Sequence, residues 1–470
     1  MSVNSLSIMP NKIYLYLIIC CFQYLSAQTD VSGTINTSTW SVSNSPYIVT
    51  GNILVNSGET LTIEPGVTVQ FDSGYSIQVD GTISARGSSS NSITFTSNNS
   101  SPSAGDWGRI FFSEVADDAV FSSGAYQSGC ILEYCNITYG GGTESSGAVH
   151  SDRSHIYLKD CSITDSGNTG IYVYKASLTL ESVNVTNSGS TGISLSCYQG
   201  GTTTLVANNC TVSNNNGSGL YYGSDSGQGS AIITNSSAIN NTGTGFSLND
   251  LYGGVTLSNS LISGNGTGIF LDANSTTNIQ KNIIVNNSSN GVNCGYSGPY
   301  NLSNNIISGN ARGINIWYSG TFSFTNNTIY NNGTSSTDIS VLATSSNYSP
   351  QITITQNLIQ ENISDATSGK SIEFNSASWT VAMNQNSFIN NTSKYLIYNQ
   401  IDAGDANIDA TDNYWGTTSS SSIDDMLYDW YDDGSVTIVD YASYTSSPNI
   451  SAPISPPANV GKEGVSGGTQ

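Results

Sequence analysis

The sequence of 470 residues has few charged side chains, few prolines and very few basic residues. Lys and Arg together number 11 against 33 Asp and Glu, which gives a formal net charge of −22. Such a chain repels phosphate backbones and anionic lipid headgroups, so nucleic acid and the inner face of a membrane are excluded as first partners. The 10 Pro and the abundance of Gly, Asn, Ser and Thr argue against long helices. The composition therefore favours an all-β fold with many tight turns.

The first 27 residues have the pattern of a secretory signal peptide. They contain the basic residue Lys12, a short apolar run over 13–22 and small residues ahead of Gln28. No later stretch is apolar enough to cross a bilayer. Six Cys remain after residue 27, and none lies in a CxxC pair or near a His at metal spacing, so zinc is disfavoured. We expect a secreted or cell-surface protein without a transmembrane segment.

A repeat dominates the rest of the chain. Each unit has alternating apolar positions, then a small or Asn position, an apolar residue two further on, and a polar turn. The apolar residues after the small position are Ile137, Ile163, Val185, Val212, Ile239, Ile262, Ile284, Ile307, Ile329, Ile359, Phe388 and Trp415. Successive members lie 22 to 30 residues apart, which leaves no room for a crossover helix. Short strands at this period predict a parallel β-solenoid.

The position two residues before each of these apolar residues tests the register. It holds Cys135, Cys161, Val183, Cys210, Ser237 and Ser260, and then Asn282, Asn305, Asn327, Asn357, Asn386 and Asn413. Six successive Asn at one inward corner can bond amide to carbonyl along the stack, so we expect an asparagine ladder. The Cys in the same column are interpreted as small buried side chains. Cys135 and Cys161 would be neighbours, close enough for a disulfide without requiring one.

The stacked units, the Asn column and the phrase Asn-Asn-x-Ile with a following Gly-Ile resemble right-handed parallel β-helix proteins. These form the pectin-lyase-like superfamily, and the similarity to its bacterial exported and surface members covers roughly residues 45–440. The resemblance implies a right-handed solenoid, here of about fifteen coils. Lyases, hydrolases, epimerases, adhesins and surface proteins share this fold, so the resemblance implies no single activity.

The ends of the stack are expected to carry caps. After an N-terminal lead over 28–44, residues 45–112 would form the opening coils. Ile423, Met426, Leu427 and Trp430 recur at helical spacing, which predicts a short amphipathic capping helix within 421–431. Residues 441–470 read as a Pro- and Ser-rich linker, and 454–460 resemble the entry strand of a fibronectin-type-III module that is missing from this chain.

Candidates for catalysis are confined to one coil. The basic and acidic side chains that it gathers are His150, Asp152, Arg153, His155 and Lys159. An imidazole or guanidinium beside a carboxylate suits a lyase, with Asp152 and Asp160 as calcium ligands, and a solvated corner is the alternative. The motifs of polygalacturonase-like hydrolases are missing apart from Asp-Asp. No other cofactor is expected.

A strip of aromatic and acidic side chains follows the repeated Gly. Its members are Tyr172, Tyr174, Tyr221, Asp225, Asp250, Phe270, Asp272, Tyr296, Trp317 and Tyr318. Aromatic faces stack on sugar rings and carboxylates accept hydroxyl hydrogen bonds, so the strip suits an extended neutral glycan. Cross-strand stacking that only stabilises the sheet is the alternative. We expect a monomeric protein of surface display or adhesion that binds a cell-surface glycan. The alternative is a polysaccharide lyase or glycoside hydrolase acting in a groove on one sheet.

Overall fold

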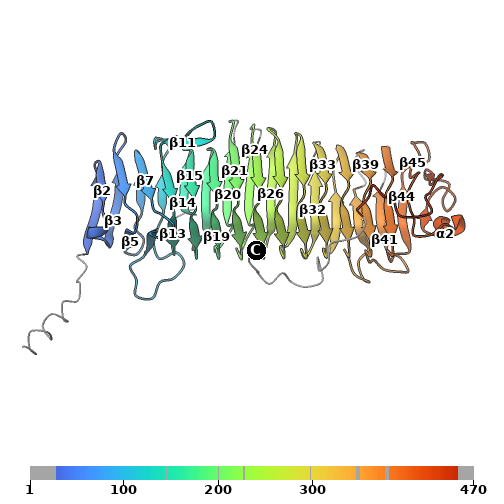
Figure 1. Ribbon diagram of the computed structural model, residues 1–470, viewed down its shortest axis with the longest axis horizontal. Helices are drawn as coiled ribbons and strands as arrows, with labels where there is room; N and C mark the ends of the chain where they lie inside the picture. The colour runs from blue at the N-terminus through green and yellow to red at the C-terminus, as the bar shows by residue number, and fades with distance from the viewer. Residues whose placement is uncertain are drawn as a thin grey trace, which may run out of the picture.

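The computed structural model describes residues 28–142, 147–198, 201–225, 228–296, 298–345, 350–375 and 380–453. In these ranges the chain winds into a parallel β-solenoid of about 14 turns with almost no helix (Figure 1). The predicted fold class is therefore confirmed. The signal peptide expected at 1–27 and the module start expected at 454–460 lie outside the described residues. In the part of the chain described, no helix is long and apolar enough to span a membrane.

The strands form three rows along the solenoid. Two rows belong to one 29-stranded sheet, joined through β1 (Thr29–Ile35) and β3 (Tyr47–Val55). The first, here called the long row, contains β6 (Ile77–Val79), β9 (Ile110–Phe112), β14 (Gly147–Asp152), β17 (Thr169–Tyr174), β20 (Ile193–Tyr198), β23 (Leu220–Asp225), β26 (Thr244–Leu251), β29 (Thr267–Ala273), β32 (Asn290–Gly295), β35 (Arg312–Ile316), β38 (Ile339–Thr344), β41 (Lys370–Asn375), β44 (Tyr395–Gln400) and β46 (Leu427–Tyr428).

The second row of that sheet, here called the short row, consists of strands of three to five residues. They are β5 (Thr68–Phe71), β8 (Ile93–Ser97), β13 (Cys135–Thr138), β16 (Ser162–Thr164), β19 (Asn184–Thr186), β22 (Thr211–Ser213), β25 (Ser237–Ile239), β28 (Leu261–Ser263), β31 (Ile283–Val285), β34 (Ile306–Ser308), β37 (Thr328–Tyr330), β40 (Leu358–Gln360) and β43 (Ser387–Ile389).

The third row is a separate 16-stranded sheet. It contains β2 (Ser38–Trp40), β4 (Thr60–Ile63), β7 (Thr82–Arg86), β12 (Ile131–Glu133), β15 (Ile156–Lys159), β18 (Leu178–Glu181), β21 (Thr204–Asn208), β24 (Ser230–Thr234), β27 (Val255–Ser258), β30 (Thr277–Gln280), β33 (Pro299–Ser303), β36 (Thr321–Thr325), β39 (Gln351–Thr355), β42 (Thr380–Asn384), β45 (Ile408–Asp409) and β47 (Val439–Asp440).

The alternating apolar residues of the strands in these three rows point into one core that runs the length of the solenoid. Ile329 pairs with Ile359 on the neighbouring short-row strand, as the repeat predicts. One predicted position is wrong: Ala238, not Ile239, pairs with Val212 and Ile262. Ala238 is fully buried, and the inward corner residue is accordingly Ser236 rather than Ser237. Because the inward Ala238 is smaller than the outward Ile239, the apolar pattern predicted the register of this strand wrongly by one residue.

The predicted asparagine ladder is present at the corner between the 16-stranded sheet and the short row. The Asn305 side-chain amide donates to Asn327 Oδ1 at 3.0 Å and to the carbonyl of Ile279 at 2.8 Å. Equivalent bonds connect Asn282, Asn305, Asn327, Asn357, Asn386 and Asn413 in turn. These ladder bonds satisfy each buried amide group within the stack. The six Cys described are all free and buried, including Cys135 and Cys161 in the same column.

A second asparagine ladder, which the sequence analysis missed, occupies the corner between the short row and the long row. Its amide-to-carbonyl bonds of 2.9 to 3.1 Å connect Asn215, Asn241, Asn265, Asn287, Asn310, Asn332, Asn362 and Asn391. The residue before many ladder members is another Asn at positive φ, for example Asn286 at 57°. Asn tolerates this left-handed conformation better than most residues, so each Asn-Asn pair turns the chain and then fills the corner.

The ends differ in detail from expectation. β1 and β2 lie in the segment expected to be an N-terminal lead, yet they pair with β3 and β4. At the other end the capping helix α2 (Ser420–Asp424) is shorter than the predicted 421–431. Leu427 pairs with Ile397 as part of β46, because backbone bonding to the open sheet edge outweighs the helical pattern. Only the single turn η1 (Val42–Asn44) adds further helix among the described residues.

A hairpin of β10 (Val120–Ser122) and β11 (Ala125–Ser128) projects over the outer face of the 16-stranded sheet. Its Phe121 and Tyr126 pack on a small satellite cluster of Ala119, Ile131 and Tyr157. The hairpin is inserted between β9 and β12, and it interrupts the regular repeat there.

Candidate functional site

Outward side chains of the long row form a continuous column along the solenoid. The strand register places each one beside its counterpart in the next coil. The column contains Gln78, Phe111, His150, Tyr172, Ser194, Tyr221, Ser247, Phe270, Asn293, Asn315, Ala343, Glu373, Tyr398 and Tyr428. Neighbouring strands lie about 4.8 Å apart, so rings, hydroxyls and amides recur at that spacing along the long axis. We refer to this outer surface as the long-row face.

A second column runs beside the first, two residues further along each strand. It contains Asp152, Tyr174, Ser196, Gly223, Asn249, Asp272 and Gly295. The backbone N–H of Trp317 donates to the carbonyl of Cys294 at 3.0 Å, so Trp317 continues this column one coil beyond Gly295. The long-row face is therefore at least two side chains wide over its central coils.

A groove of about 770 Å³ lies at the N-terminal end of the long-row face. Its lining includes Asn52, Ser76, Gln78, Arg109 and Phe111. Gln78 and Phe111 are the first two members of the column, so the groove is continuous with it. Amide, hydroxyl, guanidinium and ring groups and the carboxylate of Asp106 thus meet in one concave site, the combination that orients a polar ligand.

Arg109 is held in this groove by neutral groups. Its Nη1 lies 2.8 Å from Nδ1 of His150, and its guanidinium carbon lies 4.6 Å from the centre of the Phe111 ring. Burial, with a smaller contribution from Arg109, lowers the pKa of His150 to about 4. His150 is therefore neutral at pH 7, and its Nδ1 accepts a hydrogen bond from the guanidinium N–H of Arg109. Within the described ranges Arg109 forms no ion pair with a carboxylate, so its charge remains available to an anionic group.

The structure does not gather the coil predicted for catalysis into one site. His150 and Asp152 lie on the long-row face, where Arg153 Nε lies 3.7 Å from Asp152 Oδ1. His155 lies under the hairpin, with Nε2 2.9 Å from Thr179 Oγ1, and burial lowers its pKa. Lys159 lies on the 16-stranded sheet, 3.8 Å from Glu133 and 3.9 Å from Glu181. The predicted members face different sides of the coil because the chain turns a corner between them.

The suggested calcium ligands Asp152 and Asp160 are separated by the same corner. Asp152 ends β14 in the long row, and Asp160 follows β15 in the 16-stranded sheet. Among the described residues, no group of three or more His, Cys, Asp or Glu side chains is arranged to hold a metal ion. A calcium site at this coil stays a prediction from the sequence alone.

The predicted aromatic residues form two groups on the long-row face. Near the groove, the Tyr172 ring lies 4.9 Å from that of His150 in edge-to-face contact, and Lys175 lies 5.2 Å from the Tyr174 ring. The central group consists of Phe270, Tyr296, Trp317 and Tyr318, whose neighbouring ring centres lie 4.7 to 6.5 Å apart. Tyr221 lies between the groups and leans over Gly223. The rings contact one another, and their remaining faces point outward.

Asp272 lies beside the central aromatic group. Its side chain is only 8% exposed, and its Oδ1 accepts no hydrogen bond from the described chain. Burial raises the pKa of Asp272 to about 7, and the charge of Asp250 adds to this increase. Asp250 sits at a β-bulge in the neighbouring strand, where its φ is 53°. The strip residue Asp225 ends β23, but its side chain lies outside what the structure describes.

Sequence reasoning missed Arg109 and the polar members Gln78, Asn293 and Asn315. Arg312 Nη1 donates to Asn315 Oδ1 at 3.2 Å, and Asn315 Nδ2 donates to Asn293 Oδ1 at 2.9 Å. The alternation in β9 could have placed Arg109 next to an outward Phe111. The segment between β9 and β12 breaks the repeat, however, and so hides the register between Phe111 and His150.

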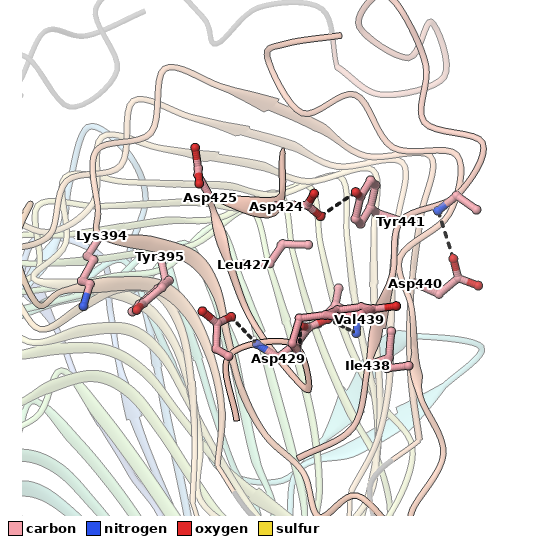
Figure 2. A pocket seen from close by; sticks show the side chains of 13 residues that line it. Lys394, Tyr395, Asp424, Asp425, Leu427, Asp429, Ile438, Val439, Asp440 and Tyr441 are labelled. Carbon is pink, nitrogen blue, oxygen red and sulfur yellow. Dashed lines mark hydrogen bonds between the residues drawn. The ribbon is translucent and has the colours of Figure 1, made fainter. Parts of the chain in front are cut away.

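A second hollow of about 880 Å³ lies at the C-terminal end, and Figure 2 shows its lining. It contains several carboxylates, but many of them bind the turn that closes the last coil. Asp429 accepts from the backbone N–H of Tyr431 and Val439, and Asp424 accepts from the Tyr441 hydroxyl. These bonds explain the acidic lining as part of the cap. The long-row face is therefore the better candidate site.

Three solved structures are similar to this chain. A periplasmic alginate epimerase, AlgG, is 11% identical over 77% of this chain and 85% of its own, with a TM-score of 0.36. The A-module of a mannuronan C-5 epimerase from Azotobacter vinelandii is 15% identical over 77% and 86%, with a TM-score of 0.28. An alginate lyase from Paenibacillus is 13% identical over 63% and 88%, with a TM-score of 0.25. At these TM-scores the likeness carries no argument about this chain.

Among curated proteins, none matches the sequence. The family model described as "right handed beta helix region" matches residues 112–260 and 248–415, which together make up more than half of the 470 residues. The matched residues contain most of the long-row face and nearly all of both asparagine ladders. The chain belongs to the right-handed β-helix family.

Proposed function

We propose that this protein is a carbohydrate-active β-helix that binds a polysaccharide lengthwise on the long-row face. The observation that carries the proposal is the outward column from Gln78 to Tyr428, whose members are at least partly exposed except for His150, Ser247, Ala343 and Glu373. Its repeat of about 4.8 Å is close to the length of one sugar unit in an extended chain. Successive sugars can therefore meet successive coils, most of which offer a ring, a hydroxyl or an amide.

The central coils favour a neutral glycan. Asp250 and Asp272 lie there beside Trp317, and the chain as a whole carries a net charge of −22. A uronate chain would bring further carboxylates against these groups, at a cost in electrostatic energy. A neutral sugar instead stacks on the aromatic rings and shares its hydroxyl hydrogens with the acidic and amide groups.

A polysaccharide lyase acting at the groove is the second candidate, and Arg109 is the observation in its favour. A guanidinium without a carboxylate partner among the described residues suits the carboxylate of a uronic acid unit. His150 and Tyr172 stand beside it in the next two coils. Surface display or adhesion, the first expectation from the sequence, is supported by no comparable feature. We retain secretion as part of the proposal, on the pattern of residues 1–27.

Affinity electrophoresis tests the proposed function. The protein is run in gels that contain neutral polysaccharides (β-glucan, xylan, mannan, galactan) or uronates (polygalacturonate, alginate). We expect retardation by at least one polysaccharide, and we expect the double variant Tyr172→Ala, Trp317→Ala to lose it. Tyr431→Ala is the matched control, because Tyr431 is 78% exposed in the turn after β46, beyond the last member of the column. Equal retardation of the double variant and the wild type would contradict the proposal.

A further inference from the structure

Asp272 carries a carboxyl group whose environment suits a proton donor. Its side chain is nine-tenths buried, and neither an ion pair nor a hydrogen bond to Oδ1 is found in the described ranges. Such a group is stabilised in its protonated form because desolvation penalises the charge. The burial raises its pKa to about 7, which leaves a large protonated fraction at neutral pH. A carboxyl tuned in this way is common where a proton must be given to a reacting group.

The burial has a specific structural cause. Asp272, Gly295 and Trp317 occupy the same column in three successive coils. Gly295 has no side chain, and the Trp317 indole fills the vacant position: a Cβ atom at Gly295 would lie 2.5 Å from Cζ2 of Trp317 and 3.0 Å from its Nε1. The indole thus lies between its own coil and that of Asp272. Trp317 Nε1 is itself buried without a partner among the described residues. Two unpaired polar atoms therefore flank one glycine.

A second carboxylate is placed next to Asp272 by an irregularity of the neighbouring strand. Asn249 pairs with Asp272 and Leu251 with Ala273, so the register shifts by one residue at Asp250. Its φ of 53° is the left-handed conformation that many turn residues of this solenoid adopt and that Asp tolerates. Bulges re-aim side chains and are frequent next to active sites. Asp250 therefore follows directly after the residue that pairs with Asp272, and its charge adds to the rise in the pKa of Asp272.

We propose that Asp272 and Asp250 are the catalytic acid and base of a glycoside hydrolase that cleaves a neutral polysaccharide held against Phe270, Trp317 and Tyr318. This inference rests on the proposed function, because the glycan must first lie on the long-row face. Asp272 donates its proton to the glycosidic oxygen as the bond from that oxygen to the anomeric carbon breaks. Asp250 takes a proton from the water whose oxygen bonds to the anomeric carbon. Proton exchange with solvent then restores both carboxyl groups.

The pair is tested by measuring reducing ends released from neutral β-glucan, xylan, mannan and galactan, together with retardation in gels of the same polysaccharides. We expect release from the polysaccharide that retards the protein. Asp272→Asn and Asp250→Asn should each reduce the release on the order of 100-fold or more while retardation persists. Asp412→Asn is the matched control, since Asp412 is an exposed Asp at a φ of 57° outside the long-row face. It should keep the wild-type rate.

The outcomes separate the two proposals. Retardation without release of reducing ends would overturn the hydrolase assignment and leave the proposed function in place. Release that is unchanged in Asp272→Asn would also overturn the assignment, since another group would then supply the proton. The absence of both retardation and release would overturn both proposals. The thermal unfolding of each variant is measured as well, so that a loss of activity can be distinguished from a loss of the fold.

Discussion

The indole ring of Trp317 lies directly over Gly295, at the position where any larger residue would place its Cβ atom. This contact connects the central aromatic group with the buried carboxyl of Asp272 one coil away from Gly295. A glycine in the second column is therefore a structural requirement of the site.

Replacement of Gly295 by Ala should displace the indole. A methyl group there would lie 2.5 Å from Trp317 Cζ2, so the ring must move outward, at a cost of about 1 to 3 kcal/mol. We expect tryptophan fluorescence to shift to the red and the pKa of Asp272 to fall toward that of an exposed Asp. Gly404→Ala is the control, because nothing lies within 4 Å of that position. An unchanged emission spectrum in Gly295→Ala would contradict the described contact.

The stability of the protein should depend on pH through Asp272. Its pKa is raised to about 7 in the folded state, against about 3.9 in an unfolded chain. Between these values the folded state binds more protons than the unfolded state, so this group lowers the free energy of unfolding as pH rises from 4 to 7. Asp272→Asn removes this pH-dependent loss of stability. Relative to wild type, the free energy of unfolding of the variant should therefore rise by on the order of 2 to 4 kcal/mol between pH 4 and pH 8. If the difference in the free energy of unfolding between Asp272→Asn and wild type were the same at pH 4 and pH 8, the raised pKa of Asp272 would be refuted.

The asparagine ladders should contribute strongly to stability. In Asn305→Ala, the backbone N–H and the side-chain amide of Asn282 both lose their acceptor at 3.0 Å. The carbonyl of Ile279 also loses a donor. We expect a loss of about 2 to 4 kcal/mol in urea unfolding, because buried polar groups are left unpaired. Asn301→Ala, which removes a half-buried outward bond to Asn278, should cost less than about 1 kcal/mol. Equal losses of stability in Asn305→Ala and Asn301→Ala would mean that the ladder bonds stabilise the fold no more than the outward bond does.

Arg109 should decide whether the groove retains acidic polysaccharides. Arg109→Gln removes the charge and keeps a hydrogen-bonding side chain, so retardation by polygalacturonate should fall while retardation by neutral glycans persists. Added salt should weaken the wild-type interaction in the same direction. Arg86→Gln is the matched control, since Arg86 pairs with Glu133 at 2.8 Å on the 16-stranded sheet. If Arg86→Gln lowered retardation by polygalacturonate as much as Arg109→Gln does, the groove would not be the anion site.

Much of the fold could be predicted because its determinants are local and repeated. The apolar alternation fixed the register of all but one short-row strand in the repeat, and the column ending in Asn413 identified one ladder. The second ladder was missed because its members follow other Asn residues, so the doublets looked like turn composition. The helix over 421–431 was overpredicted because its apolar spacing also fits a short helix followed by β46.

The site could be predicted only in part. The aromatic strip was found because its members recur after the repeated Gly. Arg109 was missed because 41 residues, including the hairpin, separate it from His150. The coil from His150 to Lys159 was grouped by closeness in sequence, although the chain turns a corner within it and points those side chains to different faces. The burial of Asp272 depends on Trp317, two coils away, and on a bulge that no local pattern reveals.

Hydroxyl-radical footprinting with a bound polysaccharide tests the central claim most directly, namely that the glycan lies along the long-row face. With the polysaccharide that retards the protein, we expect reduced oxidation of Tyr172, Phe270 and Trp317, and unchanged oxidation of Tyr431. Protection confined to the C-terminal cap or to the 16-stranded sheet would contradict the account.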